Sequence, residues 1–196
     1  MNESADVVGV ILAGGASRRM GVPKATLRIG SETLIERTIR VVQQAGVGRV
    51  LVLGGNQTWA PEATDWLPDQ HPGEGPLAAL DTAFSLTSEE WILLLSCDLV
   101  RLSVEALRHM FAAAASAPGG TFDAVVPVVG QNQYLHALYH RRLAVRVNDS
   151  VRQGERRLLA AVAGRSILEI DETEVLRNST SDADTPEAFD RLSSAE

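Results

Sequence analysis

The sequence predicts an α/β fold with a mostly parallel central sheet. Apolar runs of strand length alternate with amphipathic helical patterns along the 196 residues, as is typical of stacked βαβ units. The strand-like runs are nearly continuous in apolar residues, which indicates strands covered on both faces. Because the chain has no internal repeat and no linker-like segment, we expect a single domain over residues 1–196.

The elements follow one another in a regular order. Five apolar runs are expected to form strands: residues 7–13, 49–53, 91–97, 124–129 and 166–170. Four segments with helical spacing are expected to form helices: residues 33–45, 77–86, 104–115 and 156–163. Thr33 and Glu36 fit a capping box, and Ser103 is a candidate N-cap. A last short helix should follow Thr185, with Pro186 at its first position.

The composition is that of an ordinary globular protein, with 45% hydrophobic residues and a formal net charge of −7. This charge argues against a broad surface for nucleic acid or an anionic membrane, which would need clustered Lys and Arg. The acidic, polar start lacks the features of a signal peptide, and no segment has the ~20 apolar residues of a membrane span. A lone cysteine, Cys97, excludes an intramolecular disulfide. We therefore expect a cytoplasmic protein.

A glycine loop follows the first predicted strand. It reads Leu-Ala-Gly-Gly-Ala-Ser-Arg-Arg-Met-Gly over positions 12–21 and is followed by Lys24. Glycines let a backbone approach a ligand closely, and loop N–H groups with Arg18, Arg19 and Lys24 can hold a triphosphate and stabilise departing pyrophosphate. The spacing matches neither the P-loop nor the Gly-x-Gly-x-x-Gly dinucleotide fingerprint. The plainer interpretation is a glycine-rich turn with solvated arginines.

The loop pattern Leu-Ala-Gly-Gly-x-Ser-x-Arg-Met-Gly-x-x-Lys resembles the signature of the molybdenum cofactor guanylyltransferases. The resemblance runs from residue 10 to residue 186. It implies a three-layer, Rossmann-like nucleotidyltransferase fold with a mostly parallel central sheet. Within the loop it implies these nucleotide-binding residues: Leu12, Ala13, Gly14, Gly15 and Lys24. It also makes Lys24 and Arg19 catalytic residues.

A carboxylate, Asp98, follows the predicted strand at residues 91–97. Open α/β sheets bind ligands at the carboxyl ends of their strands, and Mg²⁺ typically takes one or two carboxylates plus substrate phosphates. Taken alone, an aspartate that caps a loop is an equally good interpretation. The Cys97-Asp98 pair is similar to the family's metal-binding position, so the resemblance makes Asp98 the Mg²⁺ ligand, a nucleotide contact and a catalytic residue. Cys97 is expected to be a packed side chain and not a nucleophile.

The segment from Asp69 to Leu77 resembles the part of the family that recognises guanine. Gly75-Pro76-Leu77 matches the family's Gly-Pro-Leu loop, although Ala79 replaces a family glycine. A carboxylate can accept hydrogen bonds from a base, and the loop backbone can shape a slot for a flat ring. Local sequence alone is equally compatible with a polar surface turn. The resemblance adds Asp69, Gly75, Pro76 and Leu77 to the nucleotide-binding residues.

Three other segments differ from the family pattern or resemble it more loosely. Only Asn56 keeps a polar side chain where the family often has Asn-x-Asn. Asp182 and Asp184 occupy positions where guanylyltransferases tend to carry asparagines. They could supply a carboxylate to a metal, or they could stabilise the N-terminus of the last helix. The segment 130–139 is similar to a family segment on the acceptor side. His136 within it is left out of the catalytic set, because a lone histidine is more often a hydrogen-bonded structural residue.

The resemblance implies transfer of GMP from GTP to molybdopterin, which gives molybdopterin guanine dinucleotide and pyrophosphate, with Mg²⁺ as cofactor. A phosphate monoester is largely ionised at neutral pH, so no general base is needed. Implied protein partners are those that deliver molybdopterin and the molybdoenzymes. Alternatives stay open: a molybdopterin cytidylyltransferase, a transferase for a sugar phosphate or phospholactate, or a nucleotide-binding module without catalysis.

Overall fold

The main sheet has eight strands in the described part of the chain, in the order β10-β7-β9-β6-β1-β4-β5, with β8 paired to β7. The computed structural model describes residues 6–14, 21–61, 64–116, 122–182 and 185–193. Four neighbouring strands are parallel, namely β6 (Trp91–Ser96), β1 (Val7–Leu12), β4 (Arg49–Leu53) and β5 (Asp65–Leu67). This confirms the expected α/β class with a mostly parallel sheet.

The other half of the sheet is built around a reversed strand. The strands are β7 (Ala124–Val129), β8 (Gln131–Asn132), β9 (His136–His140) and β10 (Ile167–Ile170). β9 lies antiparallel between β6 and β7, and β10 runs parallel to β7. Because β9 is antiparallel to both neighbours, β7 and β10 run in the same direction as β6. The short strand β8 is antiparallel to β7.

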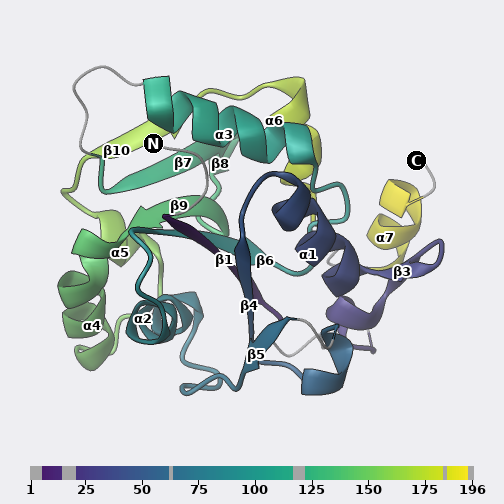
Figure 1. The fold of residues 1–196 in the computed structure, drawn as a ribbon, viewed down its shortest axis with the longest axis horizontal. Helices are drawn as coiled ribbons and strands as arrows, with labels where there is room; N and C mark the ends of the chain where they lie inside the picture. Colours follow the sequence, from purple (N-terminus) through teal and green to yellow (C-terminus); the bar gives the residue numbers. More distant parts are fainter. Residues whose placement is uncertain (1–5, 15–20, 62–63, 117–121, 183–184, 194–196) are drawn as a thin grey trace.

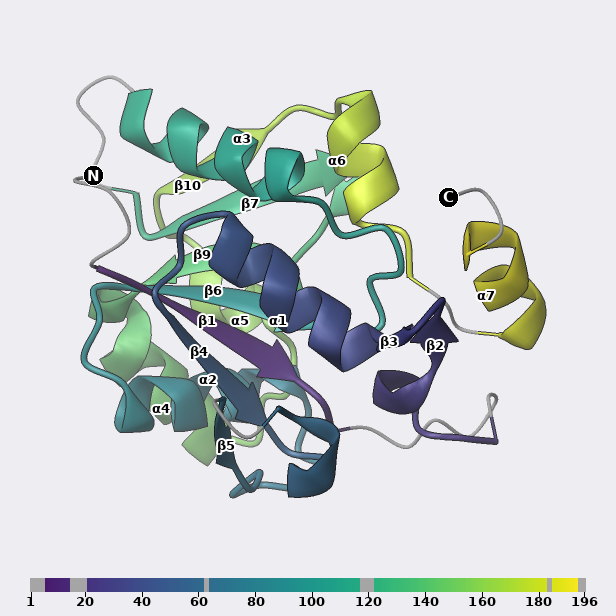
Figure 2. The ribbon, with the colours of Figure 1, turned by 45° about the vertical axis from the view of Figure 1, so that its right-hand side comes forward.

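Helices cover both faces of the sheet and make three layers (Figure 1). One face carries α1 (Leu34–Gln44), α3 (Val104–Ser116) and α6 (Glu174–Ser179), and the other carries α2 (Pro76–Leu86), α4 (Ala144–Arg152) and α5 (Leu159–Val162). Each face has its own buried apolar cluster, because successive side chains of a strand point to opposite faces. Figure 2 shows the strands running between the two helix layers.

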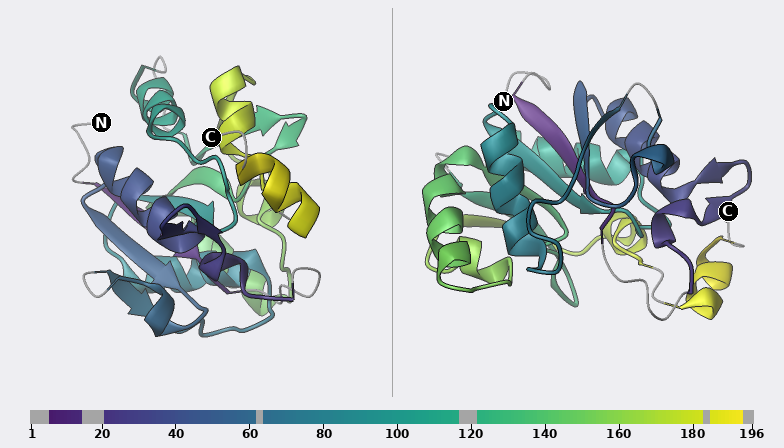
Figure 3. Two further views of the ribbon diagram at one scale, coloured as in Figure 1. Left: turned by 90° about the vertical axis from the view of Figure 1, so that its right-hand side faces the viewer. Right: turned by 90° about the horizontal axis from the view of Figure 1, so that it is seen from below.

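A smaller unit lies beside the N-terminus of α1. The two-stranded ribbon of β2 (Arg28–Ile29) and β3 (Glu32–Thr33) follows a short 3₁₀ helix, η1 (Lys24–Thr26), and α7 (Pro186–Ser193) lies next to it (Figure 3). Buried Leu34 and Val100 pack here against apolar residues of the ribbon and of α7. The remaining 3₁₀ helices are η2 (Gln57–Trp59) and η3 (Arg141–Leu143). No helix in the described residues is long and apolar enough to span a bilayer.

The predicted caps are confirmed. Thr33 and Glu36 form a reciprocal capping box at the start of α1. The hydroxyl of Ser103 accepts the Ala106 N–H at 3.2 Å, and the hydroxyl of Thr185 accepts the Ala188 N–H at 3.2 Å. These caps satisfy N–H groups that the first turn of a helix leaves without a partner.

The helix expected at residues 156–163 is wrong in its length, because α5 covers only Leu159–Val162. Two contacts hold the chain before it in another conformation. The Glu155 carboxylate accepts the N–H groups of Arg156 and Arg157, and the Arg156 carbonyl accepts the Leu77 N–H at 3.2 Å. The carbonyl that would start the helix therefore bonds the N-terminus of α2 instead.

Candidate active site

The parallel strands end together at one edge of the sheet. Leu12 of β1 is level with Leu53 of β4 and with Ser96 of β6. The segments that follow these strands, with Gly14, Gly54 and Asp98, therefore meet at the carboxyl edge, where open α/β sheets bind ligands.

Backbones approach very closely at this edge. Gly54 has a φ of 77°, and a Cβ added to it would lie 3.2 Å from the Gly14 nitrogen and 3.4 Å from the Asp69 Cβ. Only glycine adopts this conformation without strain and leaves the space open. The Gly54 N–H donates to the Leu67 carbonyl at 2.9 Å, which ties the turn to β5.

The smaller of two cavities at this edge measures about 300 Å³ and lies at the ends of β1 and β4. Five residues from the sequence prediction line it: Leu12, Gly14, Asp69, Gly75 and Pro76. The Asp69 Oδ1 accepts the His71 N–H at 2.9 Å. Its Oδ2 faces Gly14, since a Cβ on Gly14 would lie 3.9 Å from it. Oδ1 of Asp69 thus bonds the backbone of the loop that follows it, and Oδ2 lies near Gly14, which lines the same cavity.

Lys24 and Asp98 come together although they are far apart in the sequence. The Lys24 Nζ lies 2.7 Å from the Asp98 Oδ2, and the two side chains are only 15% and 14% exposed. The Ser96 hydroxyl donates to the other oxygen, Oδ1, of Asp98. Lys24 is the single lysine of the sequence, and all its other basic side chains except histidine are arginines. The Asp98 carboxylate thus contacts the compact ammonium of Lys24 through one oxygen and the Ser96 hydroxyl through the other.

A larger cavity of about 860 Å³ adjoins the small one, and the two share Pro76, Ser96 and Leu135 in their linings. Polar side chains from distant segments line it: Asp98, Gln131, His136, Arg157, Arg177 and Asp182. Arg157 is ion-paired with Glu155 and Arg177 with Glu172. The carboxyl end of β6 thus lies between a narrow slot and a wide polar cavity.

Some predicted residues lie elsewhere or outside the described residues. The Leu77 side chain is buried in the core with α2, and Ala13 is buried and bonds the Leu53 carbonyl through its N–H at 3.0 Å. Their contacts to a ligand would therefore involve mainly backbone. Gly15 and Arg19, like Arg18 and Asp184, are outside the described residues.

Cys97 is buried next to the site. Burial, with a smaller contribution from the neighbouring Asp98 carboxylate, raises the pKa of the Cys97 thiol to about 12. The thiol is therefore protonated at neutral pH, whereas a cysteine nucleophile needs the thiolate. This agrees with the expectation of a packed side chain.

The donor atoms at the carboxyl edge suit a hard divalent cation. Asp98 and Asp182 both line the larger cavity, and Asp182 is held beside the end of β6 by a bridge between its backbone and Leu99. Carboxylate oxygens are the ligands that Mg²⁺ and Mn²⁺ prefer. The described residues contain no group of three or more His, Cys, Asp or Glu side chains arranged to hold a metal.

Sequence reasoning missed most of the larger cavity. Gln131, Arg157 and Arg177 were not singled out, although each lines it. Each belongs to a different segment, and no motif spacing links them. The only sequence signal was the likeness of residues 130–139 to an acceptor-side segment of the family.

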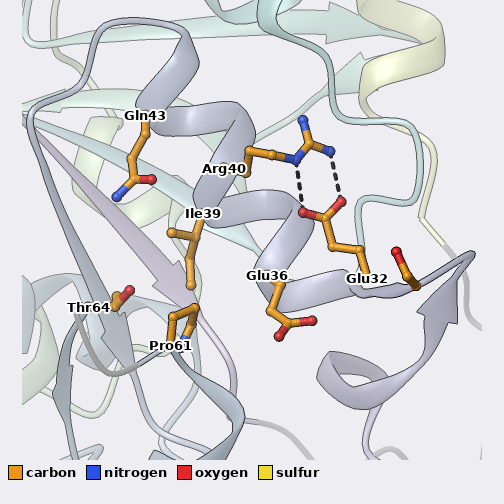
Figure 4. Close-up of a pocket in the computed structure, with 8 residues that line it drawn as sticks. Glu32, Glu36, Ile39, Arg40, Gln43, Pro61 and Thr64 are labelled. Atoms are coloured by element: carbon orange, nitrogen blue, oxygen red, sulfur yellow. Dashed lines mark hydrogen bonds and ion pairs between the residues drawn. The ribbon is translucent and has the colours of Figure 1, made fainter.

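A third cavity, of about 600 Å³, lies along α1 and shares no lining residue with the other two (Figure 4). Its charged groups already bond within the protein. The Arg40 Nε and Nη2 each donate to a Glu32 oxygen at 2.8 Å, and Glu36 bonds Thr33 in the capping box. These side chains therefore stabilise the start of α1.

A carboxylate and a lysine lie at the carboxyl edge of this sheet, between two cavities, and such residues can bind and stabilise phosphate groups. Comparison with known proteins identifies the class as the nucleotidyltransferases. The chain belongs to the family described as MobA-like NTP transferase domain, which matches residues 9–169. It is 32% identical over 173 residues to a Mycobacterium tuberculosis protein named "Probable molybdenum cofactor guanylyltransferase", with 86% of this chain and 85% of that protein covered.

Solved structures show the same fold. Molybdopterin-guanine dinucleotide biosynthesis protein A of Archaeoglobus fulgidus matches with a TM-score of 0.77 at 20% identity, covering 96% of this chain and 97% of that one. A Mycobacterium tuberculosis protein solved in complex with manganese matches with a TM-score of 0.70 at 19% identity, covering 98% and 100%. These matches confirm the three-layer nucleotidyltransferase fold.

Proposed function

We propose that the protein transfers GMP from GTP to molybdopterin, giving molybdopterin guanine dinucleotide and pyrophosphate. The observation that carries the proposal is the Lys24–Asp98 pair, 2.7 Å apart, at the junction of a narrow and a wide cavity. A reaction between two large substrates needs such a junction, because the reacting atoms must meet while the rest of each substrate is bound. The guanylyltransferase names of relatives at 30–32% identity support the choice of substrates.

The narrow cavity is proposed to bind the nucleotide through Leu12, Gly14, Asp69, Gly75 and Pro76. Its volume of about 300 Å³ is at the lower end of the usual range for small-molecule sites. Guanine presents an N1–H and a 2-amino group side by side, and the Asp69 carboxylate can accept from both. Adenine and cytosine do not present this pair of donors. Gly15 and the buried Ala13 and Leu77 complete the proposed nucleotide-binding set through their backbones.

In the proposed reaction a terminal phosphate oxygen of molybdopterin attacks the α-phosphorus of GTP. The new P–O bond forms as the bond from the α-phosphorus to the bridging oxygen breaks, and pyrophosphate leaves with the electron pair. Lys24 would stabilise the charge that builds on the leaving group, with Arg19 in the same role. The attacking phosphate is already largely ionised, because its second pKa is about 6. Positioning and charge stabilisation can therefore carry the catalysis.

We further propose that Asp98 is the protein ligand of a Mg²⁺ ion. Its hard oxygens, its low exposure and its place at the end of β6 fit that role. When bound, the ion would supply charge neutralisation at the reacting phosphates. The fold neighbour solved with manganese supports a divalent cation of this type.

The test is a product assay with the purified protein, Mg²⁺, GTP and molybdopterin. We expect pyrophosphate and molybdopterin guanine dinucleotide, identified by mass spectrometry, in equal amounts, and neither product when molybdopterin is omitted. A cytidine product formed as efficiently from CTP would favour the cytidylyltransferase alternative. Nucleotide binding without pyrophosphate from any of the four ribonucleoside triphosphates would favour a binding module.

A further inference from the structure

His136 lies at the inner wall of the larger cavity. It is the first residue of β9 and is level with Leu95 of β6. Leu95 itself lies three positions before Asp98 in the sequence. It is only 1% exposed, yet it belongs to the lining of the cavity. The side chain is thus removed from bulk solvent but borders the space proposed for the acceptor.

Neither ring nitrogen of His136 has a hydrogen-bond partner within the described residues. The histidine at the other end of the same strand is different. The His140 Nε2 bonds the Glu90 carboxylate at 2.9 Å, and its Nδ1 accepts the Arg142 N–H at 3.0 Å. Two nitrogens without partners in a buried ring are unusual, because protein interiors satisfy nearly all buried polar groups.

The other buried polar side chains follow the rule. The hydroxyls of Thr38, Thr82 and Thr87 each donate to a backbone carbonyl at 2.7–3.0 Å. The Ser179 hydroxyl accepts the Ser103 N–H at 3.4 Å. His136 is therefore the exception among the buried polar residues described, and a buried group left without a partner costs free energy. Such a cost persists where function needs the group.

The chemistry of the ring limits what it can bind. Burial lowers the pKa of the His136 imidazole to about 4. The ring is therefore neutral at physiological pH and offers one N–H donor and one nitrogen acceptor. The donor and acceptor of a neutral imidazole suit an uncharged polar group of a ligand, such as an amide or a ring nitrogen. A phosphate would instead favour a cationic side chain.

We propose that His136 is a specificity-determining residue of the acceptor site, which hydrogen-bonds an uncharged heterocyclic edge of the acceptor. This inference rests on the proposed function, because it needs an acceptor that carries a heterocycle as well as a phosphate. The phosphate of that acceptor would lie at Asp98 and Lys24. The ring system would extend into the larger cavity toward His136, with Arg157 and Arg177 also in the lining.

The proposal predicts opposite effects of one substitution on stability and on binding. His136→Leu removes two unsatisfied polar atoms while it keeps an apolar side chain of similar size. We expect it to raise the Tm of the free protein by about 2–4 °C, because the penalty for the buried polar atoms disappears. Thr38→Val is the matched control, since it removes a buried polar group that has a partner, and it should lower the Tm.

Steady-state kinetics with both substrates supply the second measurement. We expect His136→Leu to raise the KM for molybdopterin roughly tenfold to a hundredfold, while the KM for GTP changes less than about twofold. His136→Gln retains a donor and an acceptor and should recover part of the loss. Thr38→Val should leave both KM values unchanged.

Two results would overturn the inference. A Tm for His136→Leu that falls as it does for Thr38→Val would show that the ring is already hydrogen-bonded in the free protein, for example to ordered water. A KM for molybdopterin that stays at the wild-type value would show that the ring does not contact the acceptor. If the wild type turns over another acceptor, its KM is used instead. If no acceptor reacts, the proposed function fails, and the Tm comparison alone decides whether His136 is held without a partner.

Discussion

The two halves of the sheet carry the two cavities in different ways. In the parallel half, β1, β4 and β5 end in segments that approach one another backbone to backbone, as at Gly54 and Gly14. In the half around the reversed strand β9, the cavity is lined by separate side chains from β8, β9 and α6. Three glycines, Gly14, Gly73 and Gly75, belong to the lining of the first cavity, whereas the lining of the second contains no glycine among the described residues and many polar side chains.

We relate this difference between the two cavities to the ligand that each is proposed to bind. Phosphates are held by backbone N–H groups and a few fixed charges, which requires glycines at strand ends and leaves a compact sequence pattern. An acceptor ring is recognised by side chains that can come from any segment near it. Variants in the parallel half should therefore change nucleotide chemistry, and variants near β9 should change acceptor binding.

The largest effect is expected for Asp98, at the junction of the two halves. Asp98→Ala should lower the rate of transfer by about a thousandfold or more, because the metal would lose its main protein ligand. Circular dichroism should show an intact fold. Asp65→Asn is a suitable control, because Asp65 is the first residue of β5 and pairs with Arg49, the first residue of β4. Both therefore lie at the amino ends of their strands, away from the carboxyl edge that carries Asp98. Turnover of Asp98→Ala at the wild-type rate with Mg²⁺ would contradict the metal assignment.

Lys24 should give the next largest effect. Lys24→Ala is expected to lower kcat roughly a hundredfold and to leave nucleotide binding within about tenfold, because the ammonium matters most as pyrophosphate departs. Lys24→Arg should recover little, since a planar guanidinium does not replace a compact ammonium. Single-turnover kinetics and equilibrium titration with GTP separate the two quantities. If only the KM for GTP rose, Lys24 would be a binding residue without a role in the chemical step.

Asp69 tests the base specificity of the parallel half. Asp69→Asn should reduce the preference for GTP over CTP by about one to two decades, because one acceptor oxygen becomes a donor facing the donors of guanine. The ratio of kcat/KM for the two nucleotides gives the effect directly. The KM for molybdopterin should not change. A change in that value without a loss of GTP preference would place Asp69 in the acceptor site.

The smallest effect on turnover is expected from two glycines of the same loop, whose substitution should change mainly the stability of the protein. Gly75 has a φ of 89°, and a Cβ there would lie 2.9 Å from the Arg156 carbonyl oxygen. Gly73 has a φ of 83° with nothing within 4 Å of an added Cβ. Gly73→Ala should lower the free energy of unfolding by about 1 kcal/mol through backbone strain, and Gly75→Ala by about 2–3 kcal/mol because a clash is added. Equal urea midpoints would argue against the close contact at Arg156.

Sequence reasoning predicted the parallel half well. The strands β1, β4 and β6 are nearly continuous apolar runs, and the predicted strand at residues 49–53 agrees with β4 to the residue. The three-residue strand β5 was not predicted. The pairing of Lys24 with Asp98 could not be predicted in detail, because 74 residues separate them and only the folded chain brings them together. Their roles in catalysis stay predictions.

In the half around β9, the strands β7 and β10 were predicted, whereas β9 and the helix α4 were missed for physical reasons. β9 reads His-Ala-Leu-Tyr-His, which has neither a long apolar run nor strict alternation, and it is a strand because β6 and β7 pair with it on both sides. In α4 the single buried residue is Val147, so the apolar pattern is weak. A sequence does not show which hydrogen-bond partners surround a side chain. We expected His136 to be a hydrogen-bonded structural residue, but neither of its ring nitrogens has a partner among the described residues.

The most direct test of the central claim is competition between GTP and CTP in one reaction with the wild-type protein, Mg²⁺ and molybdopterin. The two dinucleotide products are separated and quantified by mass spectrometry at equal substrate concentrations. We predict that the guanine dinucleotide forms in at least about tenfold excess, because the carboxylate of Asp69 has its two donors only with guanine. Equal amounts of the two products, or an excess of the cytosine dinucleotide, would contradict guanylyl transfer as the function of this protein.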